Sequence, residues 1–139
     1  LALGEYAPPA TVAAEADALL QRYPQNLAAV NVQGAALLAD GKVEEADRVT
    51  QVLRQNPDGA RMEATYHDTL ARIDAAMGRM EDAYANYEAA LNLDASLSKT
   101  YARKLSELGF LPLSNAPAGV LTALRRCIDV KKTGCVMSH

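Results

Sequence analysis

The sequence predicts an all-α fold built from short helices that pack in antiparallel pairs. Half of the residues are apolar, but only 5% are aromatic and Trp is absent, while Ala is the most frequent residue. Ala is the best helix former, and its small side chain lets two helices approach closely. The strict alternation of apolar and polar residues that is typical of β-strands occurs nowhere in the chain. Composition and patterning therefore favour packed helices over a sheet.

Apolar residues recur at helical spacing in six successive segments. The predicted helices cover residues 12–23, 27–38, 43–53, 66–77, 80–91 and 97–108. Gly or Pro punctuates the chain between them, and the turns contain only a few residues. Consecutive helices must therefore run antiparallel, as helical hairpins. A last, short helix is expected after the turn at residues 114–117.

One pattern occurs twice in the chain. Residues 41–46 and residues 78–83 both read Gly, a cation, an apolar residue, two acidic residues and Ala. The two copies are 37 residues apart, and a helix is predicted on either side of each Gly. A period of this size, with two helices per repeat, is typical of an α-solenoid.

On these residues the chain resembles the tetratricopeptide repeat (TPR) family, whose repeat has about 34 residues. The second repeat matches the family's small, aromatic and closing positions at Gly78, Ala83, Tyr87, Ala90, Leu91, Leu93 and Asp94. The first repeat matches at Gly34, Gly41, Ala46 and Pro57. It departs from the family at Thr50, where an aromatic residue is usual. The resemblance covers roughly residues 11–111, with Tyr101 in the opening half of a third repeat.

The resemblance implies a short right-handed α-solenoid of antiparallel helix pairs. Residues 1–26 would form an N-terminal capping helix, and residues 27–111 two TPR-like repeats with the first helix of a third. Residues 112–139 would form a C-terminal capping helix and a tail that contains cysteine. Such a stack presents a concave groove that holds protein or peptide ligands.

The family's ligand-facing positions define the candidate groove of this chain. They fall on Asn31, Thr65, Asp68, Arg72, Lys99 and Arg103. Lys99 and Arg103 resemble half of the clamp with which some family members bind a peptide carboxylate. Asn31 and Ala35 stand where the other half of that clamp would be, so plain surface charge is the alternative for the two cations.

Catalytic chemistry is not expected in this chain, and neither is a cofactor or a metal. No nucleophile elbow, phosphate loop, zincin or dinucleotide motif occurs. His67 is the only internal histidine, and we expect it to pack rather than to react. Acidic pairs such as Glu44 with Glu45 begin helices, where carboxylates favour the positive end of the helix dipole.

Cys127 and Cys135 are too few for a structural zinc site, which takes four ligands. We expect them to form a disulfide, with two free thiols as the alternative. A disulfide would indicate an oxidising compartment, such as a bacterial periplasm or cell surface.

Charge and hydropathy exclude two classes of partner. The net charge of −3 gives no footprint for nucleic acid, and no apolar run reaches the roughly 18 residues of a membrane span. The first residue, Leu1, is not Met, so we expect either a removed leader or a fragment of a longer protein.

The expected function is that of a protein- or peptide-binding scaffold module in a bacterial multiprotein assembly. Two alternatives stay open at this point. One is a structural spacer or a module that forms homo-oligomers, and the other is the docking domain of a larger enzyme.

Overall fold

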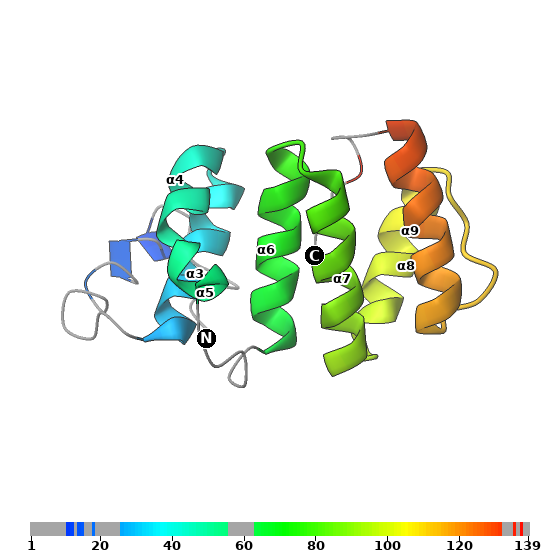
Figure 1. The fold of residues 1–139 in the computed structure, drawn as a ribbon, viewed down its shortest axis with the longest axis horizontal. Helices are drawn as coiled ribbons and strands as arrows, with labels where there is room; N and C mark the ends of the chain where they lie inside the picture. Colours follow the sequence, from blue (N-terminus) through cyan, green and yellow to red (C-terminus); the bar gives the residue numbers. More distant parts are fainter. Residues whose placement is uncertain are drawn as a thin grey trace. The chain divides into compact units, whose positions relative to one another are not determined.

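The computed structural model describes residues 11, 12, 14, 15, 18, 26–55, 63–131, 135 and 137. These residues form helices and connecting turns, and none of them lies in a strand, so the all-α prediction is confirmed (Figure 1). The helices are α3 (Leu27–Ala39), α4 (Val43–Val49), α5 (Gln51–Arg54), α6 (Ala64–Ala76), α7 (Met80–Leu93), α8 (Leu97–Glu107) and α9 (Pro117–Lys131). The chain divides into two units, Leu1–Met62 and Glu63–His139, which we describe separately.

In the first unit, α3 packs against α4 and α5. The side chain of Asn26 caps α3 by accepting a hydrogen bond from the Ala29 N–H at 3.0 Å. Ala46 of α4 and Leu53 of α5 are buried in this unit. The helix predicted over residues 12–23 lies largely outside the described residues, but those that are described in this stretch have helical backbone.

The third predicted helix is divided in two at Thr50. The buried Thr50 hydroxyl donates to the carbonyl oxygen of Ala46 at 2.8 Å and to that of Asp47 at 3.2 Å. The Gln51 side chain donates to the same Asp47 carbonyl at 3.1 Å. Side chains therefore satisfy a carbonyl that a continuous helix would bond to a backbone N–H, and such back-bonding bends helices. The break falls at the position where the first repeat departs from the family pattern.

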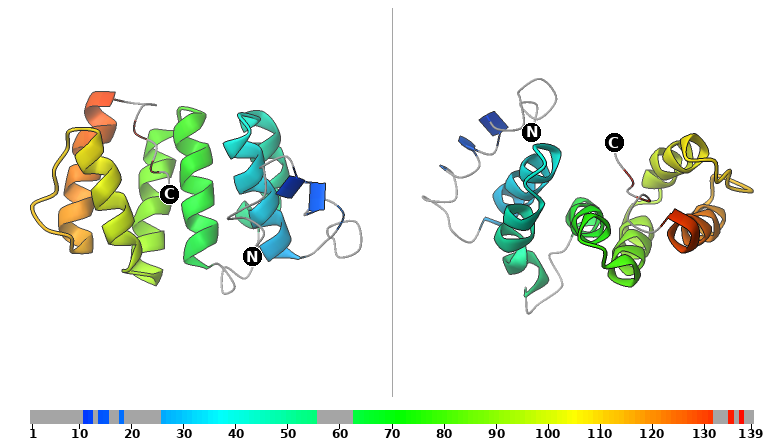
Figure 2. Two further views of the ribbon diagram at one scale, coloured as in Figure 1. Left: turned by 180° about the vertical axis from the view of Figure 1, so that it is seen from behind. Right: turned by 90° about the horizontal axis from the view of Figure 1, so that it is seen from above.

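The second unit contains α6 to α9 in two layers. Figure 2, in its right-hand view, shows α6 and α8 on one side and α7 and α9 on the other. The α6–α7 hairpin packs along its whole length, with Ala71 and Ala75 of α6 and Ala83 of α7 fully buried. Small side chains at these positions let the two helices lie close together.

Three helices end in the same way, on a glycine in the left-handed region. Gly41, Gly78 and Gly109 have φ of +80°, +84° and +91°. After α6, the N–H of Gly78 donates to the carbonyl of Ala75, and the N–H of Arg79 donates to the carbonyl of Asp74. The same pair of hydrogen bonds closes α3 and α8. This is the Schellman motif, which only glycine adopts without strain. The recurring glycines of the sequence thus mark three equivalent turns.

After Gly109, the chain departs from the hairpin pattern. Residues 109–116 contain no helix, and α9 begins at Pro117, whose fixed φ suits the first position of a helix. This helix has 15 residues, so it is longer than the short cap that we expected. Its apolar stripe continues through Leu124, Cys127 and Ile128 into the core of the unit. In the part of the chain that the structure describes, no helix combines the length and the apolar character that crossing a membrane requires.

Candidate functional site

The predicted groove residues of α6 differ in their environment. Thr65 is exposed, Asp68 is buried, and Arg72 is half-buried. Arg72 Nε lies 3.2 Å from Asp68 Oδ2, one helical turn away. That Nε atom is buried and makes no aligned hydrogen bond within the described residues, so its ion pair with Asp68 is the interaction that holds it. The Asp68 carboxylate is occupied on its other oxygen, which accepts a hydrogen bond from the Tyr101 hydroxyl of α8.

Asp68 therefore links α6 to α8, the two helices of one layer. An ion pair on α6 and a hydrogen bond from α8 both end on its carboxylate. Asp68 is 3% exposed, so we assign it to the floor of the site rather than to ligand contact. Arg72 is the member of this group that still faces solvent in part.

The predicted groove residues of α8 are exposed cations. Lys99 and Arg103 lie one helical turn apart on the solvent face of α8, and neither forms an ion pair or a side-chain hydrogen bond with any described residue. The opposite face of α8 carries the buried Tyr101 and Leu105. The structure thus brings Asp68 and Arg72 into direct contact, but no hydrogen bond or ion pair joins the side chains of Thr65, Lys99 and Arg103 to one another.

Asn31 lies on α3 in the first unit, so it is not part of the site described for the second unit. Its side-chain oxygen is buried and accepts no hydrogen bond from the described residues.

A pair of buried tyrosines, which sequence reasoning did not assign to the site, lies beside Asp68. The rings of Tyr87 and Tyr101 pack edge to face, with centroids 5.1 Å apart. Burial raises the pKa of both phenols, and the Asp68 carboxylate raises it further, most strongly for Tyr101. Both side chains are therefore neutral over the physiological pH range, so each keeps its hydroxyl proton.

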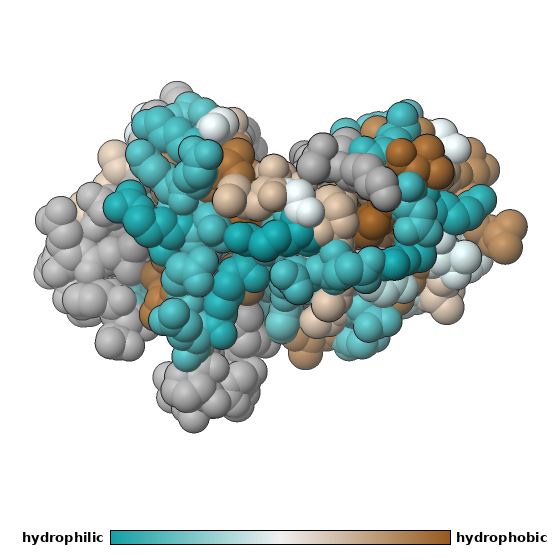
Figure 3. Space-filling model, turned by 45° about the horizontal axis from the view of Figure 1, so that its top comes forward, coloured by the Kyte–Doolittle hydropathy of each residue, from teal (hydrophilic) through white to brown (hydrophobic). Residues whose placement is uncertain are grey.

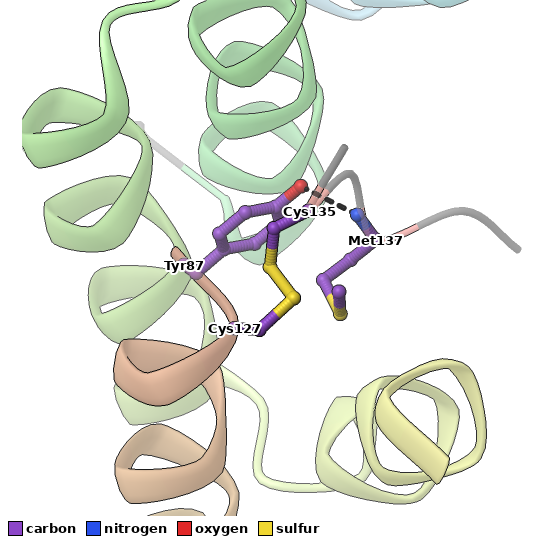
Figure 4. Close-up of a disulfide and its surroundings, with 4 residues drawn as sticks. All are labelled: Tyr87, Cys127, Cys135 and Met137. Atoms are coloured by element: carbon purple, nitrogen blue, oxygen red, sulfur yellow. Dashed lines mark hydrogen bonds between the residues drawn. A yellow bond between two sulfur atoms is a disulfide. The ribbon is translucent and has the colours of Figure 1, made fainter. Parts of the chain in front are cut away.

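Met137, in the C-terminal tail, contacts this tyrosine pair. The Met137 N–H donates to the Tyr87 hydroxyl at 3.0 Å, and this bond is buried. A disulfide joins Cys127 of α9 to Cys135, whose Cα atoms are 5.8 Å apart (Figure 4). Cys135 and Met137 are both buried. An unbroken series of contacts therefore runs from Arg72 through Asp68, Tyr101 and Tyr87 to the tail.

A second buried polar cluster lies within the α6–α7 hairpin. The Asp74 carboxylate accepts hydrogen bonds from Arg79 Nε and from Asn86 Nδ2, each at 3.0 Å. Asn86 Oδ1 faces His67 Nδ1 at 2.9 Å. Because the Asn86 amide already donates to Asp74, its oxygen must accept from His67, so Nδ1 carries the imidazole proton. Nothing in this geometry supplies a nucleophile, and the cluster cross-links the two helices.

Metal ligands do not gather anywhere in the described part of the chain: no group of three or more His, Cys, Asp or Glu side chains has suitable geometry there. Around Asp68, Tyr87 and Tyr101, the interactions that the structure shows are hydrogen bonds, an ion pair and the burial of apolar side chains.

Comparison with known proteins does not identify a family for the chain. No model of a known family matches the chain, and neither the curated proteins nor the solved structures include a significant match.

Proposed function

We propose that the chain is a protein- or peptide-binding module, built as a short TPR-like α-solenoid, whose ligand lies on the α6–α8 layer of the second unit. One observation carries the proposal. The hydroxyl of Tyr87 of α7, which lies beside Tyr101 of α8, already binds the backbone N–H of Met137, a residue that lies outside the helices. Backbone hydrogen bonds combined with burial of individual side chains are one general way in which proteins hold extended peptides.

The repeat architecture in this proposal is supported by the hairpin geometry. The two sequence copies at Gly41 and Gly78 adopt the same turn, and the alanine that ends each copy is fully buried. Equivalent turns that lead into equivalent helix crossings are what a stack of repeated hairpins requires.

The polar groups of the site favour an acidic or carbonyl-rich ligand. Lys99 and Arg103 supply exposed positive charge, and Arg72 supplies a partly exposed guanidinium that also pairs with Asp68. Guanidinium and ammonium groups bind carboxylates and carbonyl oxygens through charge-assisted hydrogen bonds. Thr65 adds an exposed hydroxyl on α6.

The test is the affinity of a partner that is first isolated on immobilised wild-type protein. Reversing both charges, in Lys99→Glu with Arg103→Glu, should weaken the complex at least tenfold, or about 1.4 kcal/mol. The matched control reverses two exposed cations of the first unit, in Lys42→Glu with Arg48→Glu, and should leave the affinity unchanged. Equal affinities for the two double variants would move the ligand away from α8.

A second candidate function, self-association, is favoured by a different observation. Leu111 and Leu113, in the segment between α8 and α9, are 71% and 94% exposed. Figure 3 shows apolar surface at the α8–α9 end of the molecule. Sedimentation analysis of the wild-type protein and of the double variant Leu111→Ser with Leu113→Ser tests this candidate. Self-association through this surface requires that the wild type is a dimer and that the double variant is a monomer.

A further inference from the structure

Met137 is held by the other residues of the second unit in the way that a residue of a peptide ligand is held. Its backbone N–H donates to the Tyr87 hydroxyl, and the residue is 1% exposed. The side chain belongs to the same buried cluster as Tyr101 and Leu105 of α8. Figure 4 shows Met137 beside the Tyr87 ring, with the disulfide next to it.

We propose that Tyr87 and the buried space that Met137 fills form a peptide-binding site, and that the chain's own Met137, anchored through Cys135, is its tethered ligand. This inference rests on the proposed function and names the ligand class and the regulation of that site. The ligand is a segment with a free backbone N–H and an unbranched apolar side chain at the position of Met137. A thioether side chain suits such a site because it is flexible and adapts to irregular cavities.

The hydrogen bonding of Tyr87 explains why an open site would take another ligand. Within the described residues, the Met137 N–H is the one hydrogen-bond partner of the Tyr87 hydroxyl. Tyr87 is fully buried with the tail in place, so loss of Met137 from the site removes the hydrogen-bond donor of the Tyr87 hydroxyl. A competing segment that supplies an equivalent N–H and covers the ring restores both the hydrogen bond and the burial.

The disulfide sets how firmly the tail occupies the site. It anchors Cys135 to Cys127 of α9, two residues before Met137. A dithiol reductant breaks this S–S bond by supplying two electrons and two protons, and the reductant itself becomes a disulfide. The two cysteines are left as thiols, and the tail is then attached only through the chain that follows α9. The site is thus closed in the oxidised protein and opens to a competing segment after reduction.

The first experiment measures binding of a defined probe to the full chain. The probe is a fluorescein-labelled peptide with the sequence of residues 132–139 carrying Cys135→Ser, and its binding is followed by fluorescence anisotropy. The chain that carries Cys135→Ser with Met137→Gly should bind the probe at least tenfold more tightly than oxidised wild type does. A probe that also carries Met137→Gly should bind this chain at least tenfold more weakly. Failure of the folded double variant to bind the probe would overturn the inference.

The second experiment uses reduction of the native disulfide and does not depend on that variant. Both sulfurs are buried, so dithiothreitol reaches them only when the tail lifts from Tyr87. Tyr87→Phe removes the hydrogen bond and keeps the ring, so reduction should be about threefold to tenfold faster. The matched control is Tyr84→Phe on the same helix, which should be reduced at the wild-type rate. Equal rates for the two variants would contradict the inference. Neither experiment uses the charge-reversal variants of α8, so the two proposals can fail separately.

Discussion

The hydrogen bond from Tyr101 to Asp68 allows the site to be tested without a ligand. Tyr101→Phe deletes one oxygen atom and keeps the ring in its edge-to-face contact with Tyr87. The acceptor is a buried carboxylate, and a hydrogen bond to a charged group contributes about 1.5–3 kcal/mol. We therefore expect the free energy of unfolding to fall by about this amount.

The assay is urea unfolding followed by far-ultraviolet circular dichroism, with Tyr84→Phe as the control. Tyr84 is half-buried on α7, and its ring lies under the Arg125 guanidinium, an interaction that phenylalanine keeps. A double variant with Arg72→Ala adds a coupling test. Each single change removes one interaction of the same Asp68 carboxylate. The loss of unfolding free energy in the double variant should therefore differ from the sum of the two single losses by at least about 0.5 kcal/mol. A loss no larger than that of Tyr84→Phe would refute the assignment of Asp68 as the link between α6 and α8.

Three further predictions concern the fold. Ala83 is fully buried between α6 and α7, so Ala83→Leu should overpack the hairpin and cost about 1–3 kcal/mol, measured as a lower thermal midpoint. Gly41 has φ of +80° and open space around it, so Gly41→Ala should cost about 1 kcal/mol through backbone strain alone, measured by urea unfolding. Burial raises the pKa of Tyr87 and Tyr101 above the ordinary value of 10.0, so the folded state holds these protons more tightly than the unfolded state. The stability that these two protonated tyrosines contribute is complete below pH 10, and above pH 10 it falls by about 1.4 kcal/mol per pH unit for each tyrosine. Tyr87→Phe should therefore reduce the fall in unfolding free energy that urea unfolding measures between pH 9 and 11.

Local features of the fold could be predicted from the sequence because they depend on neighbours in the chain. The glycines at 41, 78 and 109 mark helix ends, since each turn is closed by hydrogen bonds between residues three to five positions apart. The apolar spacing likewise predicted the described helices from α3 to α8. The break at Thr50 was not predicted, because it depends on whether a hydroxyl bonds to a carbonyl one turn earlier or to solvent.

The candidate site was less predictable, since most of its contacts join residues that are far apart in the chain. Arg72 and Asp68 are one turn apart on one helix, so their ion pair follows from spacing alone. The bond from Tyr101 to Asp68 spans 33 residues, and the bond from Met137 to Tyr87 spans 50. No local pattern encodes either contact. The signal that could have pointed to them is the pair of tyrosines at helical core positions, whose hydroxyls need partners when they are buried.

His67 shows that the hydrogen-bond partners of a residue could not be predicted even within one hairpin. The resemblance to the repeat family predicted a packed side chain for His67, and the structure has it half-buried and bonded to Asn86. Asn86 in turn bonds to Asp74, so three polar residues at core positions satisfy one another. Buried polar groups need such partners, but the sequence alone does not state which residues pair.

Site-specific photo-crosslinking tests most directly whether partners bind the α6–α8 layer of the second unit. A photoreactive amino acid is placed at Lys99 of α8 in one protein and at Glu88 of α7 in another, since both side chains are exposed and lie on different layers. The isolated partner should form a covalent adduct from position 99 and none from position 88. Adducts from position 88 alone would contradict the account and place the partner on the α7–α9 layer.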